Sequence, residues 1–185
     1  GGLNRIKGSR MDVAGKGLNV AVALHQLGRS ALCTGINYIE RGQMIRAFLD
    51  SMGVPHDFVY VEGEVRINLK IFDMSKGVVT EVNESGNPVP PECLAELRDK
   101  VNSYAAKSQM MVFGGSAPQR VPVSIYRDLI ELVNKYRVPC ILDADDELLL
   151  QGLEAAPYLV KPNLYELEKA TRIGLKTHRE IVRAA

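Results

Sequence analysis

Two glycines flank a lysine directly before an apolar helix in this 185-residue chain. The segment is Ala14-Gly15-Lys16-Gly17, and residues 17–27 continue it as a predicted helix. Glycine lets backbone amides approach a ligand closely, and the unpaired amides and positive dipole end of a helix N-terminus favour an anion. Lys16 adds a mobile positive charge. The segment predicts a site for a phosphate or a polar sugar, although the same glycines also suit a plain strand-to-helix turn.

Two familiar phosphate-binding patterns are excluded at this turn. The P-loop requires Ser or Thr after its lysine, and here Gly17 follows Lys16. The dinucleotide-binding pattern requires a third glycine where Val20 stands. Any anion bound at this helix must therefore be held in another way.

The composition is that of a soluble globular protein, with 46% hydrophobic and 24% charged residues. A net charge of +1 gives no indication of nucleic acid or an anionic membrane as partner. No apolar run approaches the roughly 20 residues of a membrane span, and no signal peptide opens the sequence. The three cysteines are widely spaced beside apolar stretches, as expected of free thiols. These features favour the cytoplasm.

Short apolar strands alternate with helices along most of the chain. This alternation predicts an α/β fold with a doubly wound, mostly parallel sheet. We expect helices over residues 17–27, 42–51, 91–105, 123–136, 146–153, 165–171 and 178–185, and strands over residues 30–36, 58–61, 66–73, 78–83, 110–113, 140–142 and 158–160.

Polar or glycine-rich groups follow several of these strands. They are the glycine turn, Gly114-Gly115-Ser116, Asp143 and Lys161-Pro162-Asn163. Ligands bind at the carboxyl ends of the strands in doubly wound sheets, so we expect these groups to line one edge.

Adjacent β segments interrupt the alternation between residues 56 and 85. In one of them, polar Arg66, Asn68 and Lys70 alternate with apolar residues, as in a strand with one polar face. We therefore expect residues 1–13 and 56–85 to form a β lid. Residues 14–55 and 86–185 would then form an incomplete α/β core.

Five segments, in this order, resemble the ribokinase-like carbohydrate kinases of the phosphofructokinase-B family. Ala14–Ala21 is similar to a Gly-Gly-Lys-Gly-x-Asn-x-Ala signature, and Glu64–Ile71 to a lid strand. Thr80–Gly86 is similar to the segment after that strand. Gly114–Pro118 is similar to a Ser-Gly-Ser-Leu-Pro loop, and Lys161–Leu167 to a Lys-Pro-Asn-x-x-Glu-Leu motif.

The resemblance implies transfer of the ATP γ-phosphoryl group to a sugar phosphate, in which positioning and charge stabilisation dominate. Its implied substrate-binding residues are Lys16, Gly17, Asn19, Arg66, Asn68 and Ser116, with Arg66 on the substrate phosphate. Its implied ATP-binding residues are Lys161, Asn163 and Glu166, with Glu166 acting on Mg²⁺ through water.

Fructose 1-phosphate, converted to fructose 1,6-bisphosphate, is the substrate that the resemblance favours. Tagatose 6-phosphate or fructose 6-phosphate phosphorylation is the alternative, as is a homologue that binds sugar phosphate without catalysis. The resemblance also implies a homodimer through the lid, with no nucleic-acid or membrane partner.

The sequence departs from the family pattern at five places, and the first is Ala14 in place of the first glycine of the signature. Tyr38–Arg41 stands where a glycine-rich turn is usual, and Asp143–Asp146 replaces Asp-x-Ser-Gly. The family's first strand would precede Gly1, and its Gly-Ala-Gly-Asp motif, which holds the catalytic base, would follow Ala185. We therefore expect no catalytic residue and little or no kinase activity in these 185 residues alone.

Several candidate residues also have simpler interpretations. Arg66 can be a solvated strand charge, and Ser116 a plain loop serine. Asn163 can cap a helix with Glu166 at its third position, a role compatible with ligand binding. Asp145 can cap the next helix, or join Asp143 and Asp146 in a metal cluster.

Overall fold

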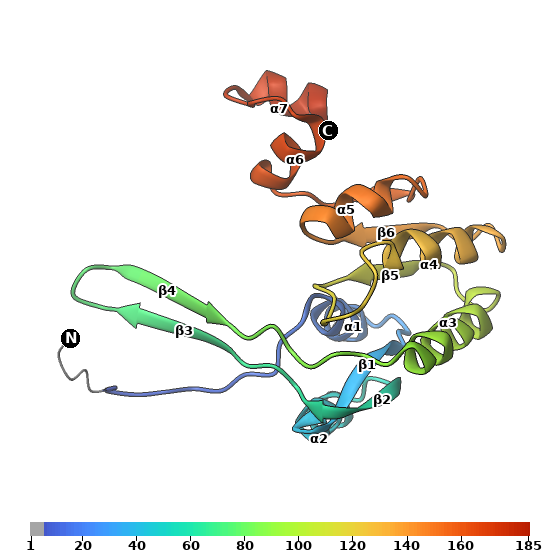
Figure 1. Ribbon diagram of the computed structural model, residues 1–185, viewed down its shortest axis with the longest axis horizontal. Coiled ribbons are helices and arrows are strands. Elements are labelled where there is room, and N and C mark those ends of the chain that lie inside the picture. Colours follow the sequence, from blue (N-terminus) through green and yellow to red (C-terminus); the bar gives the residue numbers. More distant parts are fainter. Residues whose placement is uncertain (1–5) are drawn as a thin grey trace.

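Helices and strands alternate along residues 6–185, the part of the chain that this computed structural model describes (Figure 1). The helices are α1 (Lys16–Gln26), α2 (Gly42–Ser51), α3 (Pro91–Ala105), α4 (Ile125–Asn134), α5 (Asp146–Leu153), α6 (Leu164–Thr171) and α7 (His178–Ala184). The strands are β1 (Cys33–Glu40), β2 (His56–Glu64), β3 (Asn68–Asp73), β4 (Val78–Asn83), β5 (Met111–Gly114), β6 (Cys140–Asp143) and β7 (Leu159–Val160).

The parallel pairing expected from the sequence is confirmed. β1 pairs in parallel with β2, and β5, β6 and β7 form a second parallel sheet in that order. Helix α1 contacts both β1 and β5 and so lies between the two sheets. Because parallel strands need crossover connections, each strand of these sheets is followed or preceded by a helix that covers it.

The main core lies between α3, α4 and the β5–β6–β7 sheet. Ile130 and Val133 of α4 are fully buried there, beside Leu142 of β6 and Val59 of β2. A second cluster packs α1 and α2 against the start of β1 and β2, with Leu49 at its centre. Together these clusters fix the strand ends on which the polar groups stand.

Strand β2 corrects one boundary of the expected lid. The sequence placed residues 56–64 with the lid, but β2 pairs with β1 over most of its length, from Cys33↔His56 to Tyr38↔Val61. Phe58, Val59 and Val61 are buried, because this strand is covered by helices as an inner strand of a parallel sheet is. The rest of the division into core and lid stays a prediction. Residues 1–5 of the expected lid lie outside the residues that the structure describes.

A two-stranded antiparallel hairpin, β3–β4, projects from the body of the molecule (Figure 1). Its turn is held by Asp73, whose carboxylate accepts hydrogen bonds from the backbone of Ser75 and Lys76. Gly77 there has φ 64°, a left-handed conformation that glycine adopts at little cost. Residues 6–13, which precede α1, contain no helix or strand.

Within residues 6–185, no helix combines the length and the apolar character that crossing a membrane requires.

Candidate functional site

Lys16 lies where the N-terminus of α1 meets the end of β5. The first helical hydrogen bond runs from the Asn19 amide to the Gly15 carbonyl at 2.9 Å, so Lys16 is the first residue of the helix. A Cβ atom on Gly114, at the end of β5, would lie 3.5 Å from the Lys16 Cβ and 3.1 Å from the Asp143 carbonyl oxygen. The absence of a side chain at Gly114 therefore lets α1, β5 and β6 approach closely.

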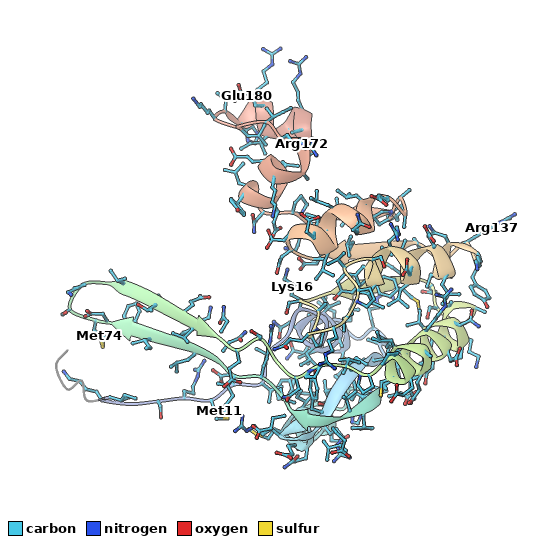
Figure 2. The ribbon with its side chains drawn as sticks, viewed as in Figure 1. Met11, Lys16, Met74, Arg137, Arg172 and Glu180 are labelled. Atoms are coloured by element: carbon cyan, nitrogen blue, oxygen red, sulfur yellow. The ribbon has the colours of Figure 1, made fainter. Side chains whose placement is uncertain are left out.

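Four charged side chains meet at this edge. The Lys16 ammonium lies 3.1 Å from Asp143 Oδ1 and 2.5 Å from Asp145 Oδ1, and Lys161 Nζ lies 3.3 Å from Asp143 Oδ1. Asp143 ends β6, and Lys161 follows β7, so the parallel strands bring these groups together from distant parts of the sequence. In Figure 2, Lys16 lies between α1 and the layer formed by α5 and β6. The expected common edge is confirmed for these groups.

The charges in this cluster stabilise one another. Burial disfavours the charged form of Lys16, but the hydrogen bonds and charges of Asp145 and Asp143 outweigh it and raise the pKa of Lys16. Burial also opposes ionisation of Asp145, yet the hydrogen bond from Lys16 and the nearby positive charges of Lys16 and Lys161 lower the pKa of Asp145. Both groups are therefore charged at neutral pH.

Asn163 and Glu166 form a reciprocal cap at the start of α6. Asn163 Oδ1 accepts from the Glu166 amide at 2.9 Å, while Glu166 Oε2 accepts from the Asn163 amide at 2.8 Å. A third hydrogen bond joins Asn163 Nδ2 to Glu166 Oε1 at 2.8 Å. The capping role expected for this pair is confirmed, and it holds a buried carboxylate beside Asp145.

Asp145 differs from its expected capping role. It occupies the N-cap position of α5 with extended backbone, but its side chain accepts no hydrogen bond from the helix. The carboxylate bonds to Lys16, 129 positions away in the chain. The next residue, Asp146, has φ 49°, so the start of α5 lacks the helical backbone that follows a normal N-cap. Lys16 and Asp145 are therefore direct partners, a pairing that neither local sequence pattern indicated.

The other expected substrate-binding residues lie around or beyond this cluster. Gly17 is the second residue of α1, Asn19 is exposed on the same helix, and Ser116 is exposed just after β5. Asn68 lies opposite Asn83 in the β3–β4 hairpin. Among the described residues, no hydrogen bond or ion pair joins any of them to the Lys16 cluster, and their ligand roles stay predictions.

Arg66 lies at the base of the hairpin. A Cβ atom on Gly86 would lie 3.8 Å from the Cβ and Cδ atoms of Arg66, so the two residues are neighbours. Burial raises the pKa of Tyr38, and the nearby positive charge of Arg66 opposes that rise. The Tyr38 hydroxyl donates to the Asn87 carbonyl oxygen at 2.6 Å, so Arg66 stands beside an anchored tyrosine. Its side chain is exposed, and its role on a substrate phosphate stays a prediction.

Tyr126 is a site residue that sequence reasoning missed. Its hydroxyl donates to the Gly115 carbonyl oxygen at 3.0 Å, and burial strongly raises its pKa, so it remains a neutral donor. Gly115 has φ 103°, a backbone conformation that residues with a side chain rarely adopt. Tyr126 thus fixes the Gly114–Ser116 turn. Eleven positions separate the tyrosine from the turn, and no local pattern links them.

The oxygen atoms near Lys161 suit a hydrated magnesium ion better than a directly bound one. No group of three or more His, Cys, Asp or Glu side chains in residues 6–185 is arranged to hold a metal ion. The buried Asp143 Oδ1 receives no well-directed hydrogen bond, although two ammonium groups lie near it. Carboxylate oxygens are the ligand type that Mg²⁺ prefers, often through water. Asp143 already pairs with two lysine ammonium groups, and the expectation that Glu166 acts on Mg²⁺ through water stays a prediction.

Comparisons with known proteins identify the family of this chain. The model of the pfkB family carbohydrate kinases matches residues 1–185. The 1-phosphofructokinase of Escherichia coli K12 is 32% identical over 186 residues, which cover all of this chain and 59% of that relative. The chain thus spans about three fifths of the length of such relatives.

Solved structures show the same fold. A possible 1-phosphofructokinase from Thermotoga maritima has a TM-score of 0.84 at 28% identity, covering 99% of this chain and 59% of that one. The tetrameric inhibited form of phosphofructokinase-2 from Escherichia coli has a TM-score of 0.87 at 26% identity, covering 100% and 61%. The same enzyme in complex with fructose-6-phosphate has a TM-score of 0.80 at 26% identity, covering 91% and 56%. The family model matches the whole sequence, and the chain belongs to the pfkB family of carbohydrate kinases.

Proposed function

We propose that the intact protein transfers the γ-phosphoryl group of ATP to fructose 1-phosphate, forming fructose 1,6-bisphosphate. The observation that carries this proposal is the cluster of Lys16, Asp143 and Lys161 at the strand ends. It stands in a chain that is 32% identical over its whole length to a 1-phosphofructokinase. Because phosphoryl transfer depends on positioning and charge, positive groups fixed at one sheet edge suit two phosphorylated ligands.

Each part of the site has a separate role in this proposal. Lys16, with Gly17 and Asn19 on the first turn of α1, binds the sugar phosphate. Lys161 and the cap formed by Asn163 and Glu166 lie on the nucleotide side, where the α6 N-terminus favours phosphate. Bound Mg²⁺ would neutralise phosphate charge there, held through water by Glu166.

Phosphorylation of fructose 6-phosphate is the second candidate. It is favoured by the similarity to phosphofructokinase-2, which has been solved with fructose-6-phosphate. Both candidates need cations for the substrate phosphate, and in this proposal Arg66, an exposed residue between β2 and β3, joins Lys16 in that role. The two candidates differ only in which sugar phosphate fits.

Substitution of Arg66 tests the proposal. With Arg66→Ala, we expect the KM for fructose 1-phosphate to rise about tenfold or more, because a charge-assisted bond to phosphate is lost. Lys70→Ala is the matched control, since Lys70 is a hairpin cation paired with Glu81 at 2.9 Å. It should leave KM unchanged. An equal effect of both substitutions would contradict a phosphate role for Arg66.

A substrate panel separates the candidates. We expect turnover of fructose 1-phosphate to exceed that of fructose 6-phosphate and tagatose 6-phosphate when each is supplied with ATP and Mg²⁺. A preference for fructose 6-phosphate would establish the second candidate instead. Binding of a sugar phosphate without turnover in the whole protein would show a non-catalytic homologue.

We also propose that the β3–β4 hairpin forms a lid and contacts a second copy of the chain. Leu69, Ile71, Val78 and Val82 are each about half exposed on one face of this hairpin. A cytoplasmic location is part of the same proposal. It is supported by the three free cysteines, because thiols stay reduced in the cytosol. Burial also raises the pKa of the Cys33 and Cys140 thiols to about 11.

A further inference from the structure

Two segments, which we call the hairpin base, join the β3–β4 hairpin to the body: residues 65–67 and 84–87. Figure 1 shows both segments running from the hairpin into the body. The side-chain amide of Asn87, in the second segment, donates to the carbonyl oxygen of Glu64 at 2.9 Å. The backbone amide of Val65, in the first segment, donates to the carbonyl oxygen of Glu40 at 3.1 Å. The hairpin base is therefore hydrogen-bonded to the ends of both β1 and β2.

Two side chains from different parts of the body hold the second segment of the hairpin base. The Tyr38 hydroxyl, from β1, donates to the Asn87 carbonyl oxygen at 2.6 Å. The Gln119 side chain, from the loop after β5, donates to the Gly86 carbonyl oxygen at 3.0 Å. The Val89 amide in turn donates to the Gln119 carbonyl oxygen at 3.1 Å. Two successive carbonyl groups of this segment are thus fixed, one by β1 and one by the loop after β5.

Arg66 lies against the segment that is held in this way. A Cβ atom built on Gly86 would contact both the Cβ and the Cδ atoms of Arg66, at 3.8 Å. The residue that follows Arg66 is also fixed, because the Ile67 amide donates to a Glu84 carboxylate oxygen at 2.7 Å and the Glu84 amide donates to the Ile67 carbonyl oxygen at 3.2 Å. The hairpin base therefore determines where the exposed Arg66 side chain starts.

Tyr38 is the buried member of this arrangement. It is 7% exposed and packs with Val61 and Val89. It belongs to the segment that departs from the family pattern at a usually glycine-rich turn, and glycine has no hydroxyl with which to hold Asn87. Packing alone would be satisfied by a phenylalanine ring, so the hydroxyl is the part of Tyr38 that connects the core to the hairpin base.

We propose that Tyr38 is a positioning residue for the substrate phosphate, and that it acts by fixing the hairpin base on which Arg66 stands. The inference rests on the proposed function, in which Arg66 binds that phosphate. Gln119 supports the same segment from the loop after β5. A side chain that is held near its binding position loses less conformational freedom when the ligand binds, so the ligand binds more tightly.

The first experiment measures KM and kcat of the intact protein for fructose 1-phosphate. Tyr38→Phe keeps the ring and removes one neutral hydrogen bond, so we expect KM to rise about fivefold. The kcat and the KM for ATP should stay unchanged, because the lost interaction is the same in the ground state and the transition state. Gln119→Ala should raise KM in the same way, and this exposed position leaves the core intact if Tyr38→Phe folds poorly.

Tyr136→Phe is the matched control for the loss of a tyrosine hydroxyl. The Tyr136 hydroxyl donates to Asn102 Oδ1 at 2.8 Å and joins the end of α4 to α3. It has no contact with the hairpin base in the hydrogen bond that it makes, so KM should stay unchanged. An equal rise in KM in Tyr38→Phe and Tyr136→Phe would overturn the inference, as would no rise in either.

A double-mutant cycle separates positioning of Arg66 from a general loss of stability. In Arg66→Ala the KM is already raised, and adding Tyr38→Phe should raise it no further. Two groups that act through one interaction are not additive, whereas independent groups are. The same fold increase from Tyr38→Phe in both backgrounds would show that Tyr38 acts without Arg66, which overturns the inference.

Hydrogen exchange measures the hairpin base directly and requires no turnover. The amides of Val65 and Glu84 donate to carbonyl oxygens at the two ends of the first segment. Both should exchange faster in Tyr38→Phe than in the unsubstituted protein, relative to the amides of α4, and should be unchanged in Tyr136→Phe. Equal exchange in Tyr38→Phe and the unsubstituted protein would show that the hydroxyl does not fix the base, and the inference would fail.

The outcomes separate this inference from the proposed function. If fructose 6-phosphate is the substrate, the function as proposed fails, and the same cycle with that sugar still tests the inference. If neither sugar phosphate is turned over, the calorimetric Kd for fructose 1-phosphate replaces KM in the cycle, and a lack of binding refutes both. A normal KM in Arg66→Ala overturns the inference, whereas turnover of fructose 1-phosphate would still support the function.

Discussion

Removal of the Asn163 side chain tests whether the α6 cap stabilises the site. In Asn163→Ala, two hydrogen bonds are lost: the one from the Glu166 amide at 2.9 Å and the one to Glu166 Oε1 at 2.8 Å. Loss of an N-cap costs about 1 kcal/mol, and loss of a hydrogen bond to a charged group costs a similar amount or more. The free energy of unfolding should therefore fall by about 2 kcal/mol.

Thermal unfolding measures this loss. For a chain of this size, about 2 kcal/mol corresponds to a fall in Tm of about 4 to 8 °C. Thr177→Ala is the matched control, because Thr177 and Glu180 form the same reciprocal cap on α7, where both are exposed. Figure 2 places Glu180 far along the C-terminal helices from Lys16. A fall below about 1 °C for Asn163→Ala would refute the capping argument.

A second substitution separates capping from ligand binding at the same place. Glu166→Gln keeps one acceptor oxygen but turns an amide group toward one of the Asn163 donors, so the cap is weakened. If Glu166 also acts on hydrated Mg²⁺, this variant needs more Mg²⁺ for half-maximal activity, while Asn163→Ala needs little more. An identical Mg²⁺ dependence in the two variants would show that Glu166 serves only as a cap.

Three other predictions concern the frame around the site. Gly42→Ala should destabilise the protein by about 2 kcal/mol, because its Cβ would lie 2.6 Å from Oδ1 of the buried Asn37. Unfolding of the double variant with Asn37→Ala should show no further loss from the Gly42 change. For Asp57, hydrogen bonds from a lysine and a tyrosine of α3 lower the pKa, so its contribution to stability is present above its unfolded value and lost as pH falls through the folded one. The Tm should thus fall between about pH 5 and pH 3, less steeply in Asp57→Asn, and equal slopes would contradict this. Light scattering tests the proposed lid contact: Leu69→Ser with Ile71→Ser should shift a dimer toward monomer, and an unchanged mass would count against it.

Helix boundaries were predictable from sequence where the signals are local. Helices α2, α3 and α5 begin and end at the expected residues. Pro91 suits the first position of α3 because its missing amide hydrogen is not needed there. Gly53, with φ 69°, follows α2 in the left-handed conformation typical of a helix end. Such signals act through neighbouring residues, so one sequence is enough to detect them.

Strand partners depended on contacts that local patterns do not contain. Residues 56–64 resemble the neighbouring hairpin strands in composition, yet β2 pairs with β1, which precedes α2 in the sequence. Phe58, Val59 and Val61 are buried in this strand, which contacts both the preceding helix α2 and the more distant helix α3. The common edge of the site could be predicted because it requires only that the strands be parallel. The position of Arg66 relative to Lys16 could not, because it depends on how the hairpin is set against the body.

Individual side-chain partners required the structure for a different reason. Asp145 satisfied a local rule for helix caps, but a lysine 129 positions away offered a full charge. The next residue, Asp146, has φ 49°, so the backbone does not continue into the helix as it does after a normal N-cap. Local rules therefore predict where such a residue stands, and the competition among all nearby groups determines what it binds.

In the two turns that depart from the family pattern, the backbone conformation is likewise not set by the side chains of the turn. Arg41 and Asp146 have φ values of 61° and 49°, in the left-handed region that glycine adopts easily and that costs other residues about 1 kcal/mol. Their ion pairs, with Glu64 at 2.9 Å and Lys169 at 2.7 Å, are exposed and contribute less than about 1 kcal/mol each. These pairs are too weak to impose the conformation, so the flanking strand and helix impose it. The order of the strand-to-helix turns therefore predicts the fold even where their glycines are replaced.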